Sequence, residues 1–345
     1  MRYKVFTLLL FCVVATFAQN QVVRRQGTKK PTSSSTTKKQ STSTTKKQGS
    51  SKTNKKTSAT TPKKTTKVGG STTKKTNSSA TKKISTTDSE SGSSNSPSNQ
   101  TTSQQIHQVN ASYSYGVLTV NGVRYEMVKV NAGTFTMGAT TEMQNPYDYE
   151  KPAHQVTLTN NYYLGKTEVT QALWTAVMGS NPSNFKGDNK PVERVSWNNC
   201  QSFISKLNAA TGKNFRLPTE AEWEFAARGG NNSRHYQYSG SNTLNEVGWY
   251  TDNNSNTTHD VATKRPNELG LYDMSGNVWE WCSDWYGSYS SNTQYDPAGP
   301  TSGSDRVSRG GGWKGSAWAC RSSGRFYGSP GSRYDILGLR LALSE

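Results

Sequence analysis

The sequence predicts an α+β domain over residues 112–345, with few helices, short strands, much irregular backbone and no parallel sheet. Three observations carry this prediction. The first two are well-marked helix starts in the middle of the chain and a hairpin signal close to the beginning of the domain. A third is the composition beyond Gly230, which is rich in Gly, Asn, Ser and Trp and shows only short strand patterns. Short strands beside a few helices are typical of an α+β domain.

The first expected strands flank Asn121-Gly122. Residues 113–120 and 123–130 roughly alternate apolar and polar side chains on the two sides of this dipeptide, which is the strongest short hairpin signal. We expect one strand on each side of the turn. Thr134–Gly138 and His154–Leu158 have the pattern of two further short strands.

Helices are expected in the middle of the domain. Thr170–Met178 is the first, and Ser196 can N-cap a second that ends at Gly212. Apolar residues recur at helical spacing in that second helix, at Cys200, Phe203, Ile204 and Leu207. The third helix, Ala221–Arg228, follows a capping box at Thr219–Glu222 and precedes two glycines.

The first 18 residues predict a secretory signal. Arg2 and Lys4 precede a mostly apolar run that ends in small residues at Ala18. The run is too short to span a membrane, and no later segment could do so. We therefore expect an exported protein, which is periplasmic, cell-surface or secreted.

Residues 19–111 predict a disordered tether. They are dominated by Thr, Ser and Lys with almost no large apolar side chain, so they cannot bury enough surface to offset the ordering entropy. Residues 28–105 carry sixteen Lys against two acids, whereas residues 106–345 carry 21 Lys+Arg and 21 Asp+Glu. A basic, DNA-binding domain is therefore not supported. The tether is interpreted as a solvated spacer, and it could also adhere to an anionic envelope surface.

Removal of the signal would leave three cysteines, Cys200, Cys282 and Cys320. Because three is odd, at most one disulfide can form and at least one thiol is left over. The four histidines show no metal-ligand spacing.

Six motifs occur in one order along the domain. They are Ala132–Gly138, Lys166–Thr170, Pro191–Trp197, Arg216–Glu224, Gly270–Trp281 and Arg309–Trp313. Together they resemble the formylglycine-generating enzyme (sulfatase-modifying factor) family, which implies a C-type-lectin-like fold. That fold hosts oxidases, sulfoxide synthases and pure binding proteins, so the resemblance is more specific for fold than for activity.

The oxidases of this family hold copper(I) with two cysteines spaced Cys-x4-Cys, since soft thiolates select that ion. Aligned on the resemblance, Gly312 stands at the family's Ser, Gly315 at its first Cys and Cys320 at its second. One thiolate of the pair is therefore missing, and Cys282 is too far along the chain to replace it. A buried structural thiol is the favoured interpretation of Cys320, copper is not expected, and a catalytic role for Cys320 is the alternative.

The resemblance also implies a calcium loop, with ligands at Asp273, Gly276, Val278 and Glu280. A side-chain oxygen, two main-chain carbonyls and a Glu within eight residues suit a hard cation. The alternative is a plain turn before a buried tryptophan pair.

Residues 326–336 are named here the C-terminal loop. They also resemble a second group of proteins, the variable proteins of diversity-generating retroelements. Nine of its residues can arise from an Asn codon whose adenines are randomised: Phe326, Tyr327, Gly328, Ser329, Gly331, Ser332, Tyr334, Asp335 and Ile336. They alternate with a frame that begins at Cys320 and ends at Arg340. Ordinary members of the family also carry Asn-, Ser- and Tyr-rich loops here.

We therefore predict a recognition module that binds a protein or glycan. Exposed aromatic side chains beside small residues are typical of adaptable binding surfaces, and the ligand face is expected at Trp313, Trp318, Phe326, Tyr327 and Tyr334. The alternatives are a formylglycine-generating oxidase acting on a sulfatase cysteine, and a structural component of a cell-envelope assembly. No specific nucleic acid and no transmembrane segment are expected.

Overall fold

The computed structural model describes residues 107–345, so the predicted signal and nearly all of the predicted tether lie outside the described residues. Three sheets and a few helices form the domain. The largest sheet has the strand order β1-β2-β3-β6-β13-β7, with bounds Ala111–Ser114, Val117–Val120, Val123–Val130, Tyr162–Gly165, Ala342–Ser344 and Phe215–Arg216. No helix of this part of the chain is long and apolar enough to cross a membrane.

The two smaller sheets contain the remaining strands. One has the order β11-β10-β8-β12, with bounds Arg325–Gly328, Arg306–Arg309, Trp279–Trp285 and Leu337–Gly338. The other has the order β4-β5-β9, with bounds Gly133–Met137, His154–Leu158 and Gln294–Tyr295. Most neighbours are antiparallel, but β12 pairs with β8, and β9 with β5, in parallel. Both pairs lie in mixed sheets, so the prediction of a domain without a parallel sheet is confirmed.

The predicted hairpin around Asn121-Gly122 is confirmed as β2 and β3. The expected single strand before it is instead two strands, β1 and β2, joined at Tyr115-Gly116. Tyr115 has φ +50° and Gly116 φ +77°, the left-handed pair that a tight two-residue hairpin turn requires. A tyrosine in that conformation is uncommon, so no local pattern indicated the turn.

The three predicted helices are present as α2 (Gln171–Met178), α3 (Trp197–Thr211) and α4 (Glu220–Ala227). Their caps explain their bounds, because the side chains of Thr170, Ser196 and Thr219 each accept a backbone N–H from the first turn. One further turn of helix, α5 (Leu244–Val247), lies where only strands were expected. Three short 3₁₀ segments complete the list of elements: Asp148–Glu150, Gly230–Asn232 and Ala317–Cys320.

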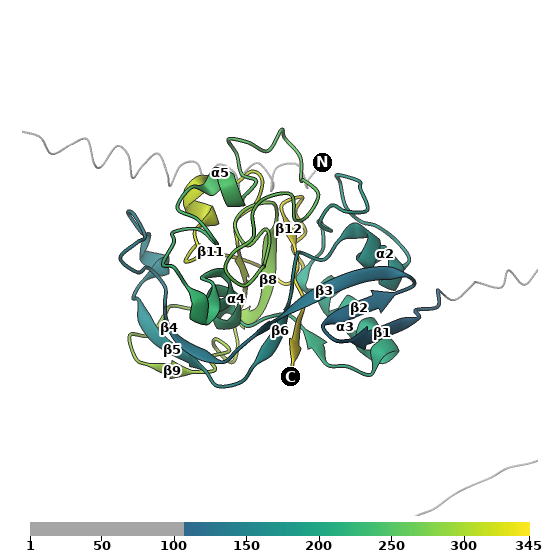
Figure 1. Ribbon diagram of the computed structural model, residues 1–345, viewed down its shortest axis with the longest axis horizontal. Helices are drawn as coiled ribbons and strands as arrows, with labels where there is room; N and C mark the ends of the chain where they lie inside the picture. Colours follow the sequence, from purple (N-terminus) through teal and green to yellow (C-terminus); the bar gives the residue numbers. More distant parts are fainter. Residues whose placement is uncertain (1–106) are drawn as a thin grey trace, which may run out of the picture. The chain divides into compact units, whose positions relative to one another are not determined.

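Two large apolar clusters hold these elements together. In the first, α2 and α3 pack with the β1–β3 strands (Figure 1). The Trp174 and Phe203 rings stack there at 4.9 Å between centroids. In the second, α4 packs between the β4-β5-β9 sheet and the β8 and β10 strands through Trp223 and Phe225. The second cluster places the start of α4 against the end of β8, where charged side chains are also buried.

Candidate recognition surface and buried thiol

The glycine run after β10, Gly310–Gly312, places the backbone in contact with the Cys320 thiol. Gly310 and Gly311 have φ values of +98° and +77°, which favour glycine. A Cβ at Gly311 would lie 2.6 Å from the Cys320 Sγ, so no other residue fits there without displacement. The run therefore encloses the sulfur.

Cys320 has 0% exposure, and burial raises the pKa of its thiol to about 12. Its carbonyl accepts a hydrogen bond from Ser275 Oγ at 2.8 Å. The thiolate, which is the form that binds copper or attacks a substrate, is disfavoured in such surroundings. The geometry therefore agrees with a structural thiol.

The three described cysteines are all free and buried, and each belongs to a different apolar cluster. Gly315, at the position of the missing thiolate, is half-buried, and its carbonyl accepts from the Thr251 N–H at 3.1 Å. A Cβ at Gly315 would meet the Gly312 carbonyl oxygen at 2.9 Å. A side chain there would crowd the backbone.

The five aromatic residues of the predicted ligand face do not share one environment. Trp313 is only 3% exposed, and its Nε1 donates to the Asp335 carbonyl at 2.9 Å, so its prediction as a surface contact was wrong. Its ring meets Phe185 edge-on at 5.2 Å. The hydrogen bond to Asp335 joins the buried Trp313 to the C-terminal loop, so Trp313 supports the loop from inside the domain.

The other four aromatic residues reach the surface. Trp318, Phe326 and Tyr334 are half-buried against the first apolar cluster, and Tyr327 is 48% exposed. Tyr327 packs beside Tyr286 at 4.4 Å between ring centroids. Sequence reasoning missed Tyr286, which lies after β8 and has no motif to mark it.

Exposure along the C-terminal loop follows the predicted alternation. All nine positions accessible from an Asn codon are at least partly exposed. The frame residues on both sides are buried, namely Cys320, Arg321, Ser322, Arg325, Leu337, Gly338, Leu339 and Arg340. Within the loop, Pro330 is half-buried and Arg333 exposed. The residues that can vary therefore lie on the surface, and most of the frame lies in the core.

The predicted calcium loop places Asp273 well for a cation. Its side chain is buried with φ +57°, Oδ2 accepts from the Ala262 N–H at 2.7 Å, and Oδ1 has no partner among the described residues. Burial raises the pKa of Asp273 to about 6. A bound cation would supply the missing partner for Oδ1.

Glu280 does not fit the same role. Arg340 donates to both of its carboxylate oxygens, with Nη2 2.6 Å from Oε1 and Nε 2.9 Å from Oε2. Trp223 Nε1 adds a third donor at 2.7 Å. The guanidinium therefore occupies the carboxylate that the loop would offer to calcium. Calcium binding at the predicted four residues stays a prediction, and this packing opposes it.

Glu168 is a further buried acid beside this loop that sequence reasoning did not assign. Its carboxylate accepts from the Val278 N–H at 2.9 Å and from Asn277 Nδ2 at 2.8 Å. Burial, and then the nearby Asp273, raise the pKa of Glu168 well above its usual range. The sequence signal that could have identified Glu168 was its position in the Lys166–Thr170 motif. Its carboxylate joins that motif to the Gly270–Trp281 motif.

An irregular α+β domain with short strands, few helices and a surface loop set in a buried frame defines a C-type-lectin-like domain of the formylglycine-generating type. Residues 119–345 match the family model described as the sulfatase-modifying factor enzyme 1-like domain. The chain belongs to this family.

Two relatives illustrate its range. Chaperone protein LppX of Paenibacillus barcinonensis is 39% identical over 206 residues, which are 45% of this chain and 70% of that protein. Formylglycine-generating enzyme of Mus musculus is 33% identical over 286 residues, which are 63% of this chain and 74% of that enzyme. The family therefore includes an enzyme and a protein named for a different role.

Solved structures agree with the fold. Treponema denticola variable protein 1 has a TM-score of 0.61 and 37% sequence identity, covering 66% of this chain and 98% of its own. PvdO from Pseudomonas aeruginosa has a TM-score of 0.53 and 25% identity, covering 64% of this chain and 94% of its own. The resemblance to a variable protein extends over the whole of that structure.

Proposed function

We propose that this chain is an exported recognition module that binds a protein or glycan through the C-terminal loop, residues 326–336. The observation that carries the proposal is the division of this segment into exposed loop positions and a mostly buried frame. Side chains on such a loop can change with less effect on the core than frame residues, because the loop positions are at least partly exposed and most frame residues are buried. The likeness to a variable protein supports the same conclusion.

The aromatic side chains of the loop supply the contact area. Tyr327 is the most exposed of them, and Phe326 and Tyr286 lie against it at 5.7 and 4.4 Å between ring centroids. Tyrosine gives a large amphipathic surface at low entropic cost, and such residues dominate binding energies.

A binding screen tests the proposal. The full chain is immobilised and exposed to a panel of glycans and of purified surface proteins, and each hit is measured again with Tyr327→Ala. We expect at least one ligand whose affinity falls about tenfold or more, as for an interface anchor. Tyr295→Ala is the control, since Tyr295 is 69% exposed on β9, outside the loop. Binding that is lost equally in both variants, or in neither, contradicts the loop as the ligand face.

The second candidate, an oxidase, has the names of several relatives in its favour. The burial and raised pKa of Cys320 oppose it. Copper(I) titration with a cysteine-containing sulfatase peptide separates the two functions. We expect neither tight copper binding nor aldehyde formation, and either result would overturn the recognition-only proposal.

The neighbouring DNA provides an independent test of loop variation. A near-copy of the 3′ end of the gene with Asn codons at the nine positions, beside a reverse transcriptase, would establish targeted diversification. Absence of such a copy would leave recognition in place and remove diversification.

A further inference from the structure

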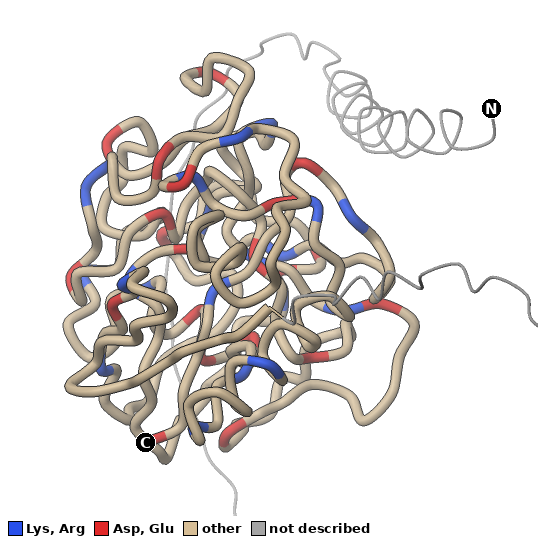
Figure 2. The backbone as a smooth tube through the Cα atoms, turned by 90° about the vertical axis from the view of Figure 1, so that its right-hand side faces the viewer, with Lys and Arg blue, Asp and Glu red and all other residues tan. Residues whose placement is uncertain are grey.

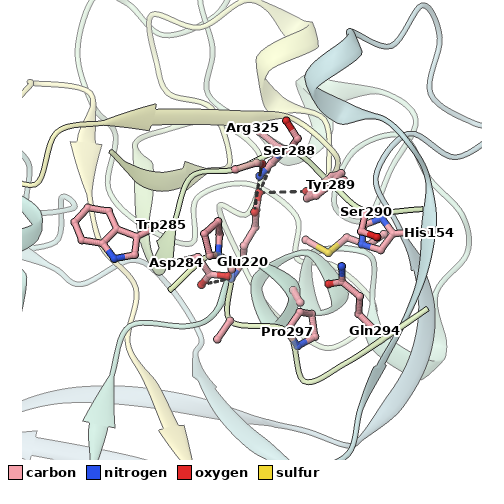
Figure 3. Close-up of a pocket in the computed structure, with 16 residues that line it drawn as sticks. His154, Glu220, Asp284, Trp285, Ser288, Tyr289, Ser290, Gln294, Pro297 and Arg325 are labelled. Carbon is pink, nitrogen blue, oxygen red and sulfur yellow. Dashed lines mark hydrogen bonds and ion pairs between the residues drawn. The ribbon is translucent and has the colours of Figure 1, made fainter. Parts of the chain in front are cut away.

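A cavity of about 230 Å³ lies at the junction of α4, β8 and β5, and no predicted site residue lines it (Figure 3). Segments distant in the sequence form its wall: His154 begins β5, Glu220 begins α4, and Asp284 lies at the end of β8. The segment after β8 adds Ser288, and β9 adds Gln294. The cavity is smaller than the roughly 300–1,000 Å³ of drug-sized pockets, so its occupant is small.

Asp284 gives the cavity an unpartnered buried acceptor. Its side chain is 3% exposed, and Oδ2 accepts from the Glu220 N–H and from Ser283 Oγ, both at 2.9 Å. Oδ1 has no hydrogen-bond partner in the described part of the chain. Gly299 passes close to it, since a Cβ there would lie 3.3 Å from Oδ1. Oδ1 is therefore open to a hydrogen-bond donor that enters the cavity, from a ligand or from water.

The other carboxylate of the wall is fully engaged. Arg325 donates to both oxygens of Glu220, at 2.6 and 2.8 Å, and Tyr289 Oη donates at 3.2 Å. Arg309 Nε lies 3.4 Å from the same carboxylate. Arg309 does not line the cavity and also pairs with Glu224, so Arg325 is the arginine of the wall that offsets Glu220, and no arginine of the wall pairs with Asp284. A ligand hydroxyl can donate to Asp284 without a charge on the ligand.

Several neutral hydrogen-bonding groups remain around the same space. The Ser288 hydroxyl and the Gln294 amide make no side-chain hydrogen bond with other described residues. Gln294 lies beside His154 in the wall, and Ser288 lies beside Arg325 (Figure 3). His154 Nδ1 lies 3.1 Å from the Pro152 carbonyl, which can only accept, so Nδ1 carries the hydrogen and Nε2 is left as an acceptor. A ligand with several hydroxyl groups would satisfy these donors and acceptors together with Asp284 Oδ1.

We propose that this cavity binds an uncharged polyhydroxylated ligand the size of one sugar ring, with a ligand hydroxyl donating to Asp284 Oδ1. The Ser288, Gln294 and His154 side chains complete the hydrogen bonds. The site is separate from the C-terminal loop, and it stands whether or not that loop binds a partner.

Saturation-transfer NMR and calorimetry on the full chain test the site at pH 8, above the raised pKa of Asp284 of about 7, so that Oδ1 is an acceptor. The probes are glucose, galactose, mannose, N-acetylglucosamine and myo-inositol, with glucosamine and glucuronate as charged counterparts. We expect at least one uncharged probe to bind, and its affinity to fall about tenfold or more in Asp284→Asn, which replaces the Oδ1 acceptor by a donor. Asp305→Asn is the matched control, because Asp305 does not line the cavity.

Ala298→Trp provides a second variant that does not depend on Asp284. Ala298 is exposed at the rim, so an indole there would fill the opening while the core stays intact, which near-UV circular dichroism verifies. We expect this variant to lose binding as well. Failure of every uncharged probe to bind, tighter binding of a charged counterpart, or unchanged affinity in both variants would overturn the proposal.

Discussion

At the scale of single residues, buried carboxylates in this domain differ in whether an arginine holds them. Glu280 and Glu224 face Arg340 and Arg309, and all four side chains are fully buried. Asp284 and Asp273 each leave one oxygen without a partner among the described residues. We expect the carboxylates paired with arginine, the first kind, to stabilise the packing of the core. The carboxylates with an unpartnered oxygen, the second kind, should make the stability of the fold depend on pH.

Arg340→Met tests the first kind. The variant leaves Glu280 as a buried charge without its counterion, and we expect a loss of about 3–5 kcal/mol in the free energy of unfolding, measured in urea. Arg265→Met is the matched control, because the side chains of Arg265 and Glu246 are 56% and 46% exposed and their pair should contribute less than about 1 kcal/mol. A loss for Arg340→Met no larger than for the control would show that the buried pair is not structural.

Asp284→Asn tests the second kind. Burial, and then Glu220, raise the pKa of Asp284 to about 7, so between about pH 4 and pH 7 the folded domain holds a proton that the unfolded chain has released. This carboxyl therefore lowers stability as the pH rises through that window. We expect the variant to be more stable than wild type at pH 8 by on the order of 1.4 kcal/mol per pKa unit of the shift.

Urea unfolding from pH 4 to pH 8 measures this difference. Asp273 and Glu193, whose pKa values burial raises to about 6 and about 7, are present in both proteins and cancel in the comparison. Parallel stability curves for variant and wild type would contradict the assignment to Asp284.

At the scale of elements, local side-chain caps decide where the helices begin. Thr219 Oγ1 accepts from the Glu222 N–H at 3.1 Å, and the Glu222 carboxylate accepts from the Thr219 N–H at 2.8 Å. These signals lie within four residues of one another, so the sequence predicted α4 to within one residue. The β1–β2 turn was missed because it depends on a left-handed tyrosine, Tyr115.

Thr219→Ala removes the cap of α4, and we expect it to cost about 1 kcal/mol of stability in urea unfolding. Thr243→Ala is the control, since Thr243 precedes α5 without a side-chain cap, and its effect should stay within about 0.5 kcal/mol. Equal losses in the two variants would mean that the cap of α4 does not determine its stability.

At the scale of the whole molecule, charge is divided between the two parts of the chain. Basic and acidic residues are interspersed over the domain (Figure 2), whereas residues 28–105 carry sixteen Lys and two acids. Residues 106–345 carry 21 Lys+Arg and 21 Asp+Glu, so the domain has no net charge to attract an anionic partner. Any electrostatic adhesion would come from the N-terminal residues.

Vesicle binding tests this division. We expect the full chain to sediment with phosphatidylserine vesicles at low salt and to be released toward 0.5 M salt, where the Debye length is about 4–5 Å. Residues 107–345 alone, checked for folding by circular dichroism, should stay in solution at every salt concentration. Equal binding by the domain, or binding that salt does not weaken, would contradict a role for the lysine-rich segment.

The sequence by itself determined the family, the helix caps, the hairpin at Asn121-Gly122 and the alternation of the C-terminal loop. These features depend on residues close together in the chain, or on motifs whose order is fixed. Tertiary structure alone decided that Trp313 is buried and that Arg340 takes the carboxylate of Glu280, sixty residues earlier in the chain. It also decided that Asp284 lines a cavity with His154, from another sheet. Burial and the choice of partner depend on long-range packing, which no local pattern encodes.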